Sequence, residues 1–540
     1  MTIDAVDLII ILTYMVVVTT VGVWLTRRRT VTGEVYFLAG RSLRWPVIGT
    51  ALFASNISTI HLVGLPEGGY KYGLVLGNFE WMATFTLMLL ALVFAPFYYQ
   101  SRISTLPEFL EKRYCGSTRT ILACMSIVSA LLIHIGISLF AGAAVFKEFF
   151  GINIVTSVLL ISLVTCLYSA LGGLKAVVFT ETVGTVVLLT GAITVTLMAI
   201  FALRSAGVHS LADLQAAVKT DQLSMLHSSN KDGFAWYAIF LVYPVIGIWY
   251  WCTEQTIVQR VLGAHTQRDA QNGALFAGVL KILPVFFMVL PGVLGYVLYR
   301  SELGEEGRRI FPHMVNTLMP VGLKGLVAAA LVAALMSSIG GALNSVGTLV
   351  AIDLVKHFRP RTSDAGQVRI GAVSSVVVML LAMCWSTQGD KFGSIFEAVI
   401  KMPAQLLAPP ITTVFVWGVF WPRGTRQAAI TTLMVGFIYG IIAFVIDLPM
   451  FGDIQWISDS QNGLGICPMM QAWWNFCLCS VIFFVSSLLT PKPDAAVMEK
   501  LTWSSPLKVI FHGRLTGAGD PRMLAAALFA IMVVLYCIFR

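Results

Sequence analysis

Long apolar stretches recur from one end of this chain to the other, and they constrain its fold more than any other feature. A helix that crosses a bilayer needs about 20 mostly apolar residues. About 14 stretches of the 540-residue sequence meet that need, at approximately 5–26, 46–70, 75–100, 119–149, 153–171, 176–203, 235–257, 272–299, 322–354, 369–388, 392–420, 427–447, 468–490 and 522–539. Because lipid offers the backbone no hydrogen-bond partner, we expect an all-α polytopic membrane protein with about 14 transmembrane helices.

The composition and the hydrophilic stretches exclude several classes of protein. About 57% of the residues are apolar and 12% are charged, whereas soluble domains carry roughly 25% charged residues. The longest hydrophilic stretches, 204–234 and 491–521, are too short to form a second domain. A water-soluble enzyme, a disordered chain and a nucleic-acid-binding protein are therefore poor fits, and we expect one transmembrane domain over 1–540.

The charges around the apolar stretches predict the orientation of the chain. The leading helix, 5–26, has Asp4 and Asp7 on its N-terminal side and three arginines after it, which is the reverse of a signal peptide. With the N-terminus outside, 23 basic residues, Arg260 among them, fall in inward-facing segments and 11 in outward-facing ones. Basic residues gather on the cytoplasmic side. The net charge of +9 is therefore interpreted as a topology signal, and an even number of spans is expected.

The nine cysteines give no sign of a disulfide framework or of a transition-metal site. Most lie inside apolar stretches, and no pair has CxxC spacing. Cys477 and Cys479, two residues apart, are interpreted as buried thiols.

Six ionisable residues fall within the apolar stretches and are candidates for function, because each costs about 2.5–3.5 kcal/mol to insert into a bilayer. They are His61, Glu80, Glu181, Lys281, Glu397 and Lys401. His61, Glu80 and Lys281 lie on three different spans with no local partner, and a polar cavity shared by all three is the favoured interpretation.

The other three ionisable residues leave alternatives open. Glu181 lies near the end of a span, so it is either a solvated interfacial carboxylate or a functional group. Glu397 and Lys401 are four residues apart on one predicted helix, so they either neutralise each other or contact the solute.

The second apolar stretch has the composition of a broken helix. Residues 54–61 are rich in hydroxyl and amide side chains, and Pro66, Gly68 and Gly69 follow them. Irregular backbone at membrane depth survives where it lines a cavity, and its free carbonyls can ligate a cation. A simple proline kink is the alternative.

The ninth stretch carries a second cluster of small and hydroxyl residues, at 334–345, which includes Ser337 and Ser338. Small residues at this spacing also promote helix packing. Taken with the first cluster, however, they predict an ion site of carbonyl and hydroxyl oxygens. Because neither cluster contains a carboxylate, a monovalent ion suits the site better than calcium.

These segments carry a resemblance to a known family. The motifs are Ala54–Ile57 with Val63–Leu65, Gly77–Trp81, Thr105–Leu110, Tyr168–Val177, Trp249–Gln255, Val258–Arg260 and Leu335–Ser338. In their order and number they resemble the sodium/solute symporter family, and within it the sodium/glucose cotransporters, over about residues 35–445. The resemblance implies a LeuT-type fold with discontinuous helices, built from two inverted five-helix repeats at 46–203 and 235–420. The leading helix and C-terminal helices at 427–539 would flank the repeats.

The resemblance also implies the sites. The sodium ion would be held by the carbonyls of Ala54, Ile57 and Ala334 and by the hydroxyls of Ser337 and Ser338. The sugar would be bound by polar residues and flat rings on several spans, namely Asn56, His61, Glu80, Lys281, Lys401, Tyr250 and Trp251. Tyr250 would cover the sugar from inside, and Leu65 and Phe79 from outside.

The sequence departs from the family pattern at two site positions. Lys401 stands where glutamine is common, although Gln405 lies one turn away. Glu181 stands where the family usually has an aspartate near the sodium exit. The lysine makes plain glucose a less certain solute, whereas the glutamate keeps the charge.

The residues and the resemblance together predict a sodium-coupled symporter that imports a sugar or related polyol by alternating access, in a plasma membrane or bacterial inner membrane. Sodium is expected to be the coupling ion, with no cofactor. A symporter for a carboxylate solute and a sensor that binds solute without moving it stay open as alternatives. A polytopic membrane enzyme is disfavoured because no HExxH, paired-aspartate or nucleophile-elbow pattern is found. The solute, the sodium stoichiometry and the oligomeric state cannot be read from the sequence.

Overall fold

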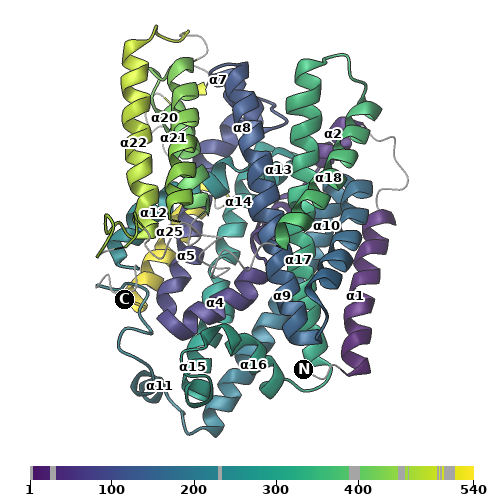
Figure 1. Cartoon of the computed structure of the whole chain (residues 1–540), viewed down its shortest axis with the longest axis vertical. Helices are drawn as coiled ribbons and strands as arrows, with labels where there is room; N and C mark the ends of the chain where they lie inside the picture. The colour runs from purple at the N-terminus through teal and green to yellow at the C-terminus, as the bar shows by residue number, and fades with distance from the viewer. Residues whose placement is uncertain are drawn as a thin grey trace.

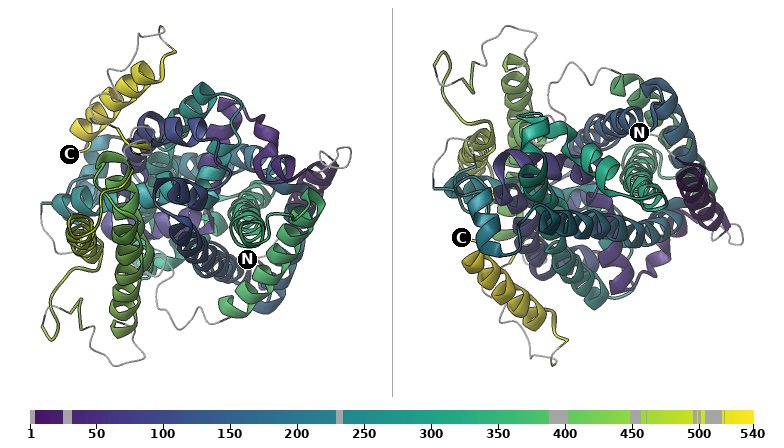
Figure 2. Two further views of the ribbon diagram at one scale, coloured as in Figure 1. Left: turned by 90° about the horizontal axis from the view of Figure 1, so that it is seen from above. Right: turned by 90° about the horizontal axis from the view of Figure 1, so that it is seen from below.

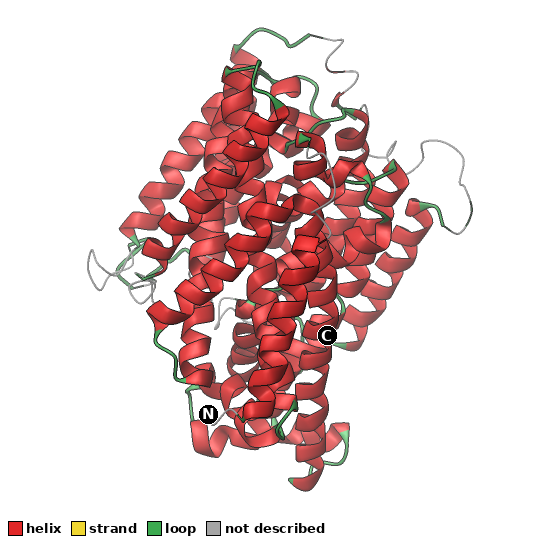
Figure 3. Ribbon diagram, turned by 90° about the vertical axis from the view of Figure 1, so that its right-hand side faces the viewer, coloured by secondary structure: helices red, strands yellow, loops and turns green. Residues whose placement is uncertain are grey.

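A computed structural model of the chain describes residues 4–24, 32–228, 234–387, 402–447, 456–459, 461–494, 498, 501–503, 517 and 519–540. Within these ranges the protein is helical throughout, with no β-strand and only two single-residue bridges. Figure 3 shows the helices running largely side by side. The all-α prediction is therefore confirmed for the described part of the chain.

The longer helices have 12 residues or more, and most of them correspond to predicted spans. They are α1 (Ala5–Trp24), α3 (Trp45–Asn56), α4 (Thr59–Tyr72), α5 (Asn78–Leu89), α8 (Gly116–Ser129), α9 (Ser138–Phe150), α10 (Ile154–Ser205), α12 (Trp236–Gly247), α14 (Gln267–Leu280), α15 (Leu290–Leu303), α17 (Leu323–Thr348), α18 (Asp364–Ser386), α20 (Ala408–Phe420), α21 (Arg426–Ile446), α22 (Pro468–Leu489) and α25 (Pro521–Ile538).

Shorter helices and helical turns connect these elements or extend them. The short α-helices are α2 (Gly33–Leu38), α6 (Ala95–Gln100), α7 (Leu106–Arg113), α11 (Leu211–Ala217), α13 (Gln255–Leu262) and α16 (Ile310–Leu318). The π-helical segments are η3 (Leu90–Phe94), η4 (Ala130–Ile137), η5 (Ile248–Thr253), η6 (Val285–Val289), η8 (Leu349–Lys356) and η10 (Pro403–Leu407). The 3-10 turns are η1 (Ala39–Arg41), η2 (Leu74–Gly77) and η7 (Gly307–Arg309).

The predicted spans all have counterparts among the described residues. Twelve helical segments are long and apolar enough to cross a membrane, and the bent pair α3 and α4 would make a thirteenth. The remaining predicted span, 153–171, corresponds to the shorter apolar helix Ile154–Leu167. The number of 14 crossings stays a prediction, because no membrane fixes which helices traverse it.

A glycine separates the fifth and sixth predicted spans within α10, which consists of two helices joined at a kink. Gly173 has φ 58° and ψ −164°, a conformation outside the helical region. A Cβ at this position would lie 2.5 Å from the carbonyl oxygen of Tyr36, so a side chain has no room. Glycine is the residue that tolerates both the positive φ and the close approach, and this position turns the chain from one span into the next.

Helix α17 lies at the centre of the molecule, whereas the terminal helices lie at its edge. Of the best spanning window in Leu323–Lys356, 94% is buried, compared with 17% in Pro521–Ile538. Helix α17 packs against α1, α3, α10 and α18, and Figure 2 shows α25, in yellow, at the rim. The small residues of α17 allow this close packing on every side.

The N-terminus lies at the same end of the molecule as α11, α15 and α16, as Figure 1 shows. The predicted outer loop 204–234 contains α11. The two segments that are predicted to face outside therefore share one end. Which side of the membrane that end faces stays a prediction.

Candidate functional site

The break between α3 and α4 releases backbone carbonyls in the middle of the second predicted span. The two helices, Trp45–Asn56 and His61–Tyr72, meet at 62°. The Ser58 N–H, which would donate to the Ala54 carbonyl in a continuous helix, donates to Nδ1 of His61 at 3.2 Å. The His61 N–H donates to the Ser58 carbonyl at 3.0 Å rather than to that of Ile57. The carbonyls of Ala54 and Ile57 are thus freed from the helical ladder.

The position of this break differs from the simplest expectation for the sequence. Pro66 lies inside α4 and does not end it. The break comes earlier, at Ile57 and Ser58, where Ser58 caps α4 in a reciprocal pair with His61. A capping side chain gives the first N–H groups of a helix a partner, so a new helix can begin there.

The second hydroxyl cluster meets this break. The Ser337 hydroxyl, on α17, donates to the Ala54 carbonyl at 3.0 Å. The Ser338 hydroxyl is buried and makes no hydrogen bond within the described part of the chain. Ile57 and Ala334, the other two predicted sodium ligands, are also buried, and Ala334 lies in the uninterrupted part of α17.

Four of the predicted solute-binding residues form a cluster around a buried ion pair. Lys281, at the C-terminal end of α14, donates to Oε2 of Glu80 and to Oδ1 of Asn56. Nε2 of His61 lies 3.6 Å from Oε1 of Glu80. The side chains of Lys281 and Glu80 are only 1% and 2% exposed. The structure therefore brings together residues of three predicted spans, as the shared-cavity hypothesis requires.

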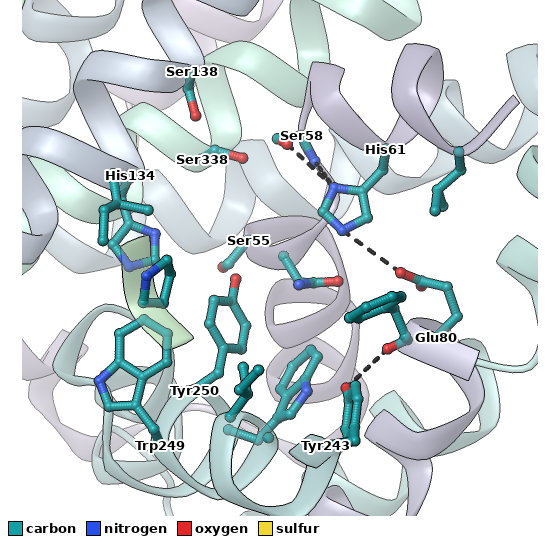
Figure 4. Close-up of a pocket in the computed structure, with 18 residues that line it drawn as sticks. Ser55, Ser58, His61, Glu80, His134, Ser138, Tyr243, Trp249, Tyr250 and Ser338 are labelled. Atoms are coloured by element: carbon teal, nitrogen blue, oxygen red, sulfur yellow. Dashed lines mark hydrogen bonds and ion pairs between the residues drawn. The ribbon is translucent and has the colours of Figure 1, made fainter. Parts of the chain in front are cut away.

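A cavity of about 170 Å³ lies beside this cluster. Several of the predicted site residues line it, from both the ion group and the solute group: Asn56, His61, Leu65, Phe79, Glu80, Tyr250, Trp251 and Ser338. Lys281 lies just behind the wall, with Nζ 5.5 Å from the centre of the Trp251 ring. Figure 4 shows Ser338 and Ser55 on one side of the cavity and His61 with Glu80 on another.

The predicted gate residues are held by neighbouring aromatic rings. The Phe79 ring packs edge-on against Phe234 and Tyr243, with centroids 6.4 and 6.2 Å away. The Tyr243 hydroxyl donates to the Phe79 carbonyl at 2.8 Å. Leu65 is buried, and Tyr250 stacks edge-on against Trp251 with centroids 5.1 Å apart. All of these residues except Phe234 line the cavity, and their gating roles stay predictions.

Glu181 is not a solvated interfacial carboxylate. Its side chain is fully buried, forms an ion pair with Arg260 and accepts a hydrogen bond of 3.0 Å from the Ser55 hydroxyl. Gly341 on α17 makes room for this pair, since a Cβ there would lie 2.3 Å from a guanidinium nitrogen of Arg260. The pair thus contacts Ser55, the residue that follows Ala54, and the role of Glu181 in sodium exit stays a prediction.

Arg260 also corrects the charge count that supported the orientation. It was grouped with inward-facing loop residues, but it lies in helix α13 with a side chain that is 0% exposed. This basic residue is therefore buried within the protein and is not an exposed loop residue of the kind that the charge count assumes.

Two of the predicted site residues, Lys401 and Glu397, lie outside the described residues. Gln405, which stands one turn from Lys401, is described. It is buried and donates to Gln471 on α22, and it is not among the residues that line the cavity. Within the described chain, Gln405 therefore lies outside the cavity wall, and which residue fills the family's glutamine position stays a prediction.

The structure adds cavity residues that the sequence-based prediction missed, most notably His134 on η4 and Trp249 on η5. His134 lies within the apolar stretch 119–149. The rule that selected His61, an ionisable residue in a membrane span, selects His134 equally well.

Comparison with known proteins identifies the family. The model of the sodium:solute symporter family matches residues 36–436. The chain belongs to this family. The resemblance predicted from the motifs is confirmed, and the protein is therefore a sodium-coupled transporter of the membrane and not an enzyme.

Among the relatives is a sodium/mannose cotransporter of Bos taurus, 33% identical to this chain, with 95% of this chain and 92% of the relative covered. A sodium/myo-inositol cotransporter 2 of Sus scrofa is 31% identical, with 93% and 79% covered. A sodium/glucose cotransporter 4 of Danio rerio is 33% identical, with 93% and 81% covered.

Solved structures show the same fold at lower identity. The substrate-bound outward-open structure of a Na+-coupled sialic acid symporter matches with a TM-score of 0.74 at 19% identity, covering 91% of this chain and 99% of that one. A transporter of the nucleobase-cation-symport-1 family in a closed conformation matches with a TM-score of 0.50 at 12% identity, covering 86% and 97%. The LeuT-type arrangement of helices is thus confirmed.

Proposed function

We propose that the protein imports a neutral sugar or related polyol together with sodium. The observation that carries the proposal is the pairing of Lys281 with Glu80 and Asn56 beside an aromatic-lined cavity. The pairing cancels the lysine charge and leaves the cavity wall polar but close to neutral. The solutes in the names of the relatives, mannose, myo-inositol and glucose, are of the same chemical class.

The cavity offers the contacts that a ring of hydroxyl groups needs. Glu80 supplies acceptor oxygens, whereas Asn56 and His61 can each donate or accept. The ring of Tyr250 can stack on the apolar face of a pyranose. A solute that lacks a hydroxyl would leave one of these buried groups unpaired, so the site would discriminate strongly against deoxy analogues.

The proposed sodium site uses the carbonyls of Ala54, Ile57 and Ala334 and the hydroxyls of Ser337 and Ser338. Two of these oxygens, on Ala54 and Ser337, already lie 3.0 Å apart. The unpaired Ser338 hydroxyl gives the ion a further oxygen. Bound sodium would tie α17 to the break between α3 and α4, next to the solute cavity.

Coupling between sodium and solute follows because the proposed sodium site and the solute cavity share the break between α3 and α4. If sodium holds the break in the shape that the solute needs, it raises the affinity for solute, and by linkage the solute raises the affinity for sodium equally. An inward-directed charge gains about 2.3 kcal/mol per 100 mV of membrane potential. Loss of sodium to the cytoplasm would then release the solute inward.

The remaining features of the prediction belong to the same proposal. The inverted repeats would occupy 46–203 and 235–420, and the N-terminus would face outside. Leu65 and Phe79 would close the outer side of the cavity and Tyr250 the inner side. These assignments rest on the motifs and on the position of the gate residues in the cavity wall.

A carboxylate solute is the second candidate, and the charge balance disfavours it. The ammonium group of Lys281 is already paired with Glu80, so a carboxylate would have to displace a buried ion pair. Breaking such a pair costs about 3–5 kcal/mol. Neutral polyols make no such demand.

The experiment is uptake into proteoliposomes that contain the purified protein. Radiolabelled glucose, mannose, myo-inositol and glucuronate are offered with an inward sodium gradient and, as the control, with an equal potassium gradient. We expect uptake of at least one neutral polyol only with sodium. Uptake of glucuronate alone would favour the carboxylate symporter. Saturable binding without flux would favour a sensor, and uptake that is equal with potassium would contradict sodium coupling.

A further inference from the structure

The side chain of Asn78 joins three separate parts of the molecule at the start of α5. Its Nδ2 donates to the carbonyl of Val75 in η2, at 2.9 Å, and to that of Met225 in the loop between α11 and α12, at 2.6 Å. Its Oδ1 accepts a hydrogen bond of 2.8 Å from the hydroxyl of Tyr536 on α25. Asn78 is only 1% exposed. Both amide hydrogens and the amide oxygen of this buried side chain are thus bonded.

The last turn of α25 makes further contacts with the same region. The N–H of Met225 donates to the carbonyl of Phe539 at 2.7 Å, so the loop bonds to α25 as well as to Asn78. The rings of Tyr536 and Phe539 pack edge-on against the buried Trp81, with centroids 5.3 and 5.7 Å away. Figure 1 shows α25 beside α5. Although α25 lies at the rim of the molecule, its last turn therefore contacts the buried first turn of α5.

The same loop also bonds to the end of α4. Nε2 of Gln222 donates to the carbonyls of Gly69 and Tyr70, at 3.5 and 3.1 Å. The carbonyl of Gln222 accepts a hydrogen bond of 2.9 Å from the N–H of Leu74. The last carbonyls of a helix lack partners within the helix, so such bonds stabilise its end. The segment 222–225 thus fixes the end of α4 relative to the start of α5.

The position of the Glu80 carboxylate depends on this arrangement. Asn78 and Glu80 both lie in the first turn of α5. Glu80 lines the cavity, and its partners Lys281 and His61 come from α14 and α4. A binding group must be held within about 0.5 Å of its productive position by the packing and hydrogen bonds around it. The contacts of Asn78 provide such support at the start of the helix that carries Glu80.

We propose that Asn78 is a positioning residue for solute binding. Together with Tyr536 and the segment 222–225 it forms a clamp, which holds the first turn of α5 so that Glu80 meets the hydroxyl groups of the solute. This inference rests on the proposed function, which gives Glu80 its contact with solute. Asn78 is not among the residues that line the cavity, so it acts through Glu80. A helix outside the predicted repeats, α25, thus contributes to the selectivity of the site.

The test measures uptake into proteoliposomes by variants of the clamp. Tyr536→Phe removes one hydrogen bond to Asn78 and keeps the ring that packs on Trp81. It should raise KM for the best neutral polyol about threefold to tenfold, as for the loss of one hydrogen bond, with little change in kcat. Asn78→Ala removes three hydrogen bonds and should raise KM further. If Asn78→Ala does not fold, Tyr536→Phe carries the test alone.

Tyr99→Phe is the matched control. Tyr99 lies near the other end of the same candidate span, Leu74–Gln100. Its hydroxyl donates to the carbonyl of His265 at 3.0 Å, so the variant also removes one tyrosine hydrogen bond. KM for the polyol should stay the same in this variant, because the bond lies far from the clamp along the span.

Monodeoxy analogues of the polyol separate positioning from a general structural effect. In the unchanged protein, an analogue that lacks a hydroxyl bound by Glu80 should have a higher KM than the parent solute. In the Tyr536 and Asn78 variants this preference should shrink for such analogues and remain for the others. The sodium concentration for half-maximal uptake at saturating solute should stay within about twofold of its original value, because no proposed ion ligand lies on α5.

The outcomes distinguish the inference from the function on which it rests. If the variants lower kcat or the melting temperature but leave KM and the preference among analogues unchanged, the clamp serves only the fold, and the symporter stands. An equal rise in KM for the parent and for every analogue contradicts a role through Glu80. If the unchanged protein takes up no neutral polyol, the proposed function fails and the inference fails with it.

Discussion

The Ser337 hydroxyl donates a hydrogen bond to the carbonyl oxygen of Ala54 at 3.0 Å and thereby joins the middle of α17 to the end of α3. The two residues are 283 positions apart in the chain. Both oxygens are of the kind that a small hard cation prefers, and the Ser338 hydroxyl beside them has no partner among the described residues. The contact thus marks the place where an ion could replace a direct hydrogen bond.

Removing the Ser338 hydroxyl should weaken sodium binding without lowering the stability of the protein. Because that hydroxyl makes no hydrogen bond here, Ser338→Ala should leave the melting temperature of the sodium-free protein nearly unchanged. Loss of one oxygen ligand to a charged ion, worth about 1.5–3 kcal/mol by analogy with hydrogen bonds to charged groups, should raise the half-saturating sodium concentration at least tenfold. The measurement is solute uptake as a function of sodium.

Ser375 on α18 gives the matched control. Its hydroxyl is also buried, but it donates to the carbonyls of Leu343 and Gly371, at 2.9 and 3.0 Å. Ser375→Ala should cost some stability and leave the sodium dependence alone. Equal sodium dependence in the Ser338 and Ser375 variants would contradict the assigned ion site.

Removing both charges of the Lys281–Glu80 ion pair should restore stability but not transport. Glu80→Gln or Lys281→Met alone leaves a buried charge unpaired, at a cost of about 3–5 kcal/mol. The double variant removes both charges, so its melting temperature should recover. Solute uptake should nevertheless stay lost, because an amide keeps only one of the two acceptor oxygens of Glu80 and the ammonium donor of Lys281 is gone. Melting curves in detergent and uptake in proteoliposomes measure the two effects, and normal uptake by the double variant would rule out a solute role.

Local features of the sequence predict the helices well, whereas contacts between residues far apart in the chain are harder to predict from it. Apolar stretches report spans because the energy of inserting a helix into lipid is summed over one contiguous segment. The turn at Gly173 and the partner of Glu181 depend on residues elsewhere in the chain, Tyr36 and Arg260 respectively. Nothing within a few positions of Glu181 indicates that a guanidinium 79 residues away will neutralise it.

Residues of the candidate site could be predicted where a motif fixes their position in the sequence. They were harder to predict where the direction of a side chain depends on its exact position around a helix. His61, Glu80 and Lys281 meet as expected. Gln405, by contrast, is one turn from the position of interest and points to Gln471. His134 satisfies the same physical rule as His61, because it is an ionisable residue within an apolar stretch, so its position could also be predicted from the sequence.

The buried pair of Glu181 and Arg260 allows a test of the proposed sodium exit. Either single change, Glu181→Gln or Arg260→Met, should lower the melting temperature strongly, since each leaves an uncompensated buried charge. The double variant should be nearly as stable as the original protein. If Glu181 serves only the fold, the double variant transports normally. If Glu181 helps sodium leave, the double variant is stable but transports solute slowly. The transport rate should fall further when the internal sodium concentration is raised.

Asp7 should stabilise the helix that carries the ion site. Its Oδ1 accepts hydrogen bonds of 2.7 Å from the N–H groups of Gly322 and Gly325, at the N-terminal end of α17. A carboxylate at this end of a helix satisfies free N–H groups and interacts favourably with the helix dipole. Asp7→Ala should therefore lower stability by about 1–2 kcal/mol, measured as a lower melting temperature in detergent. The exposed Asp4 is the control. Among the described residues its carboxylate accepts a hydrogen bond only from the N–H of Val6, at 3.2 Å, so Asp4→Ala removes a carboxylate that does not contact α17. Since no residue of α1 lines the cavity, half-saturating sodium should change little in the Asp7 variant, and a large rise would mean that α1 positions Ser337 and Ser338 through α17.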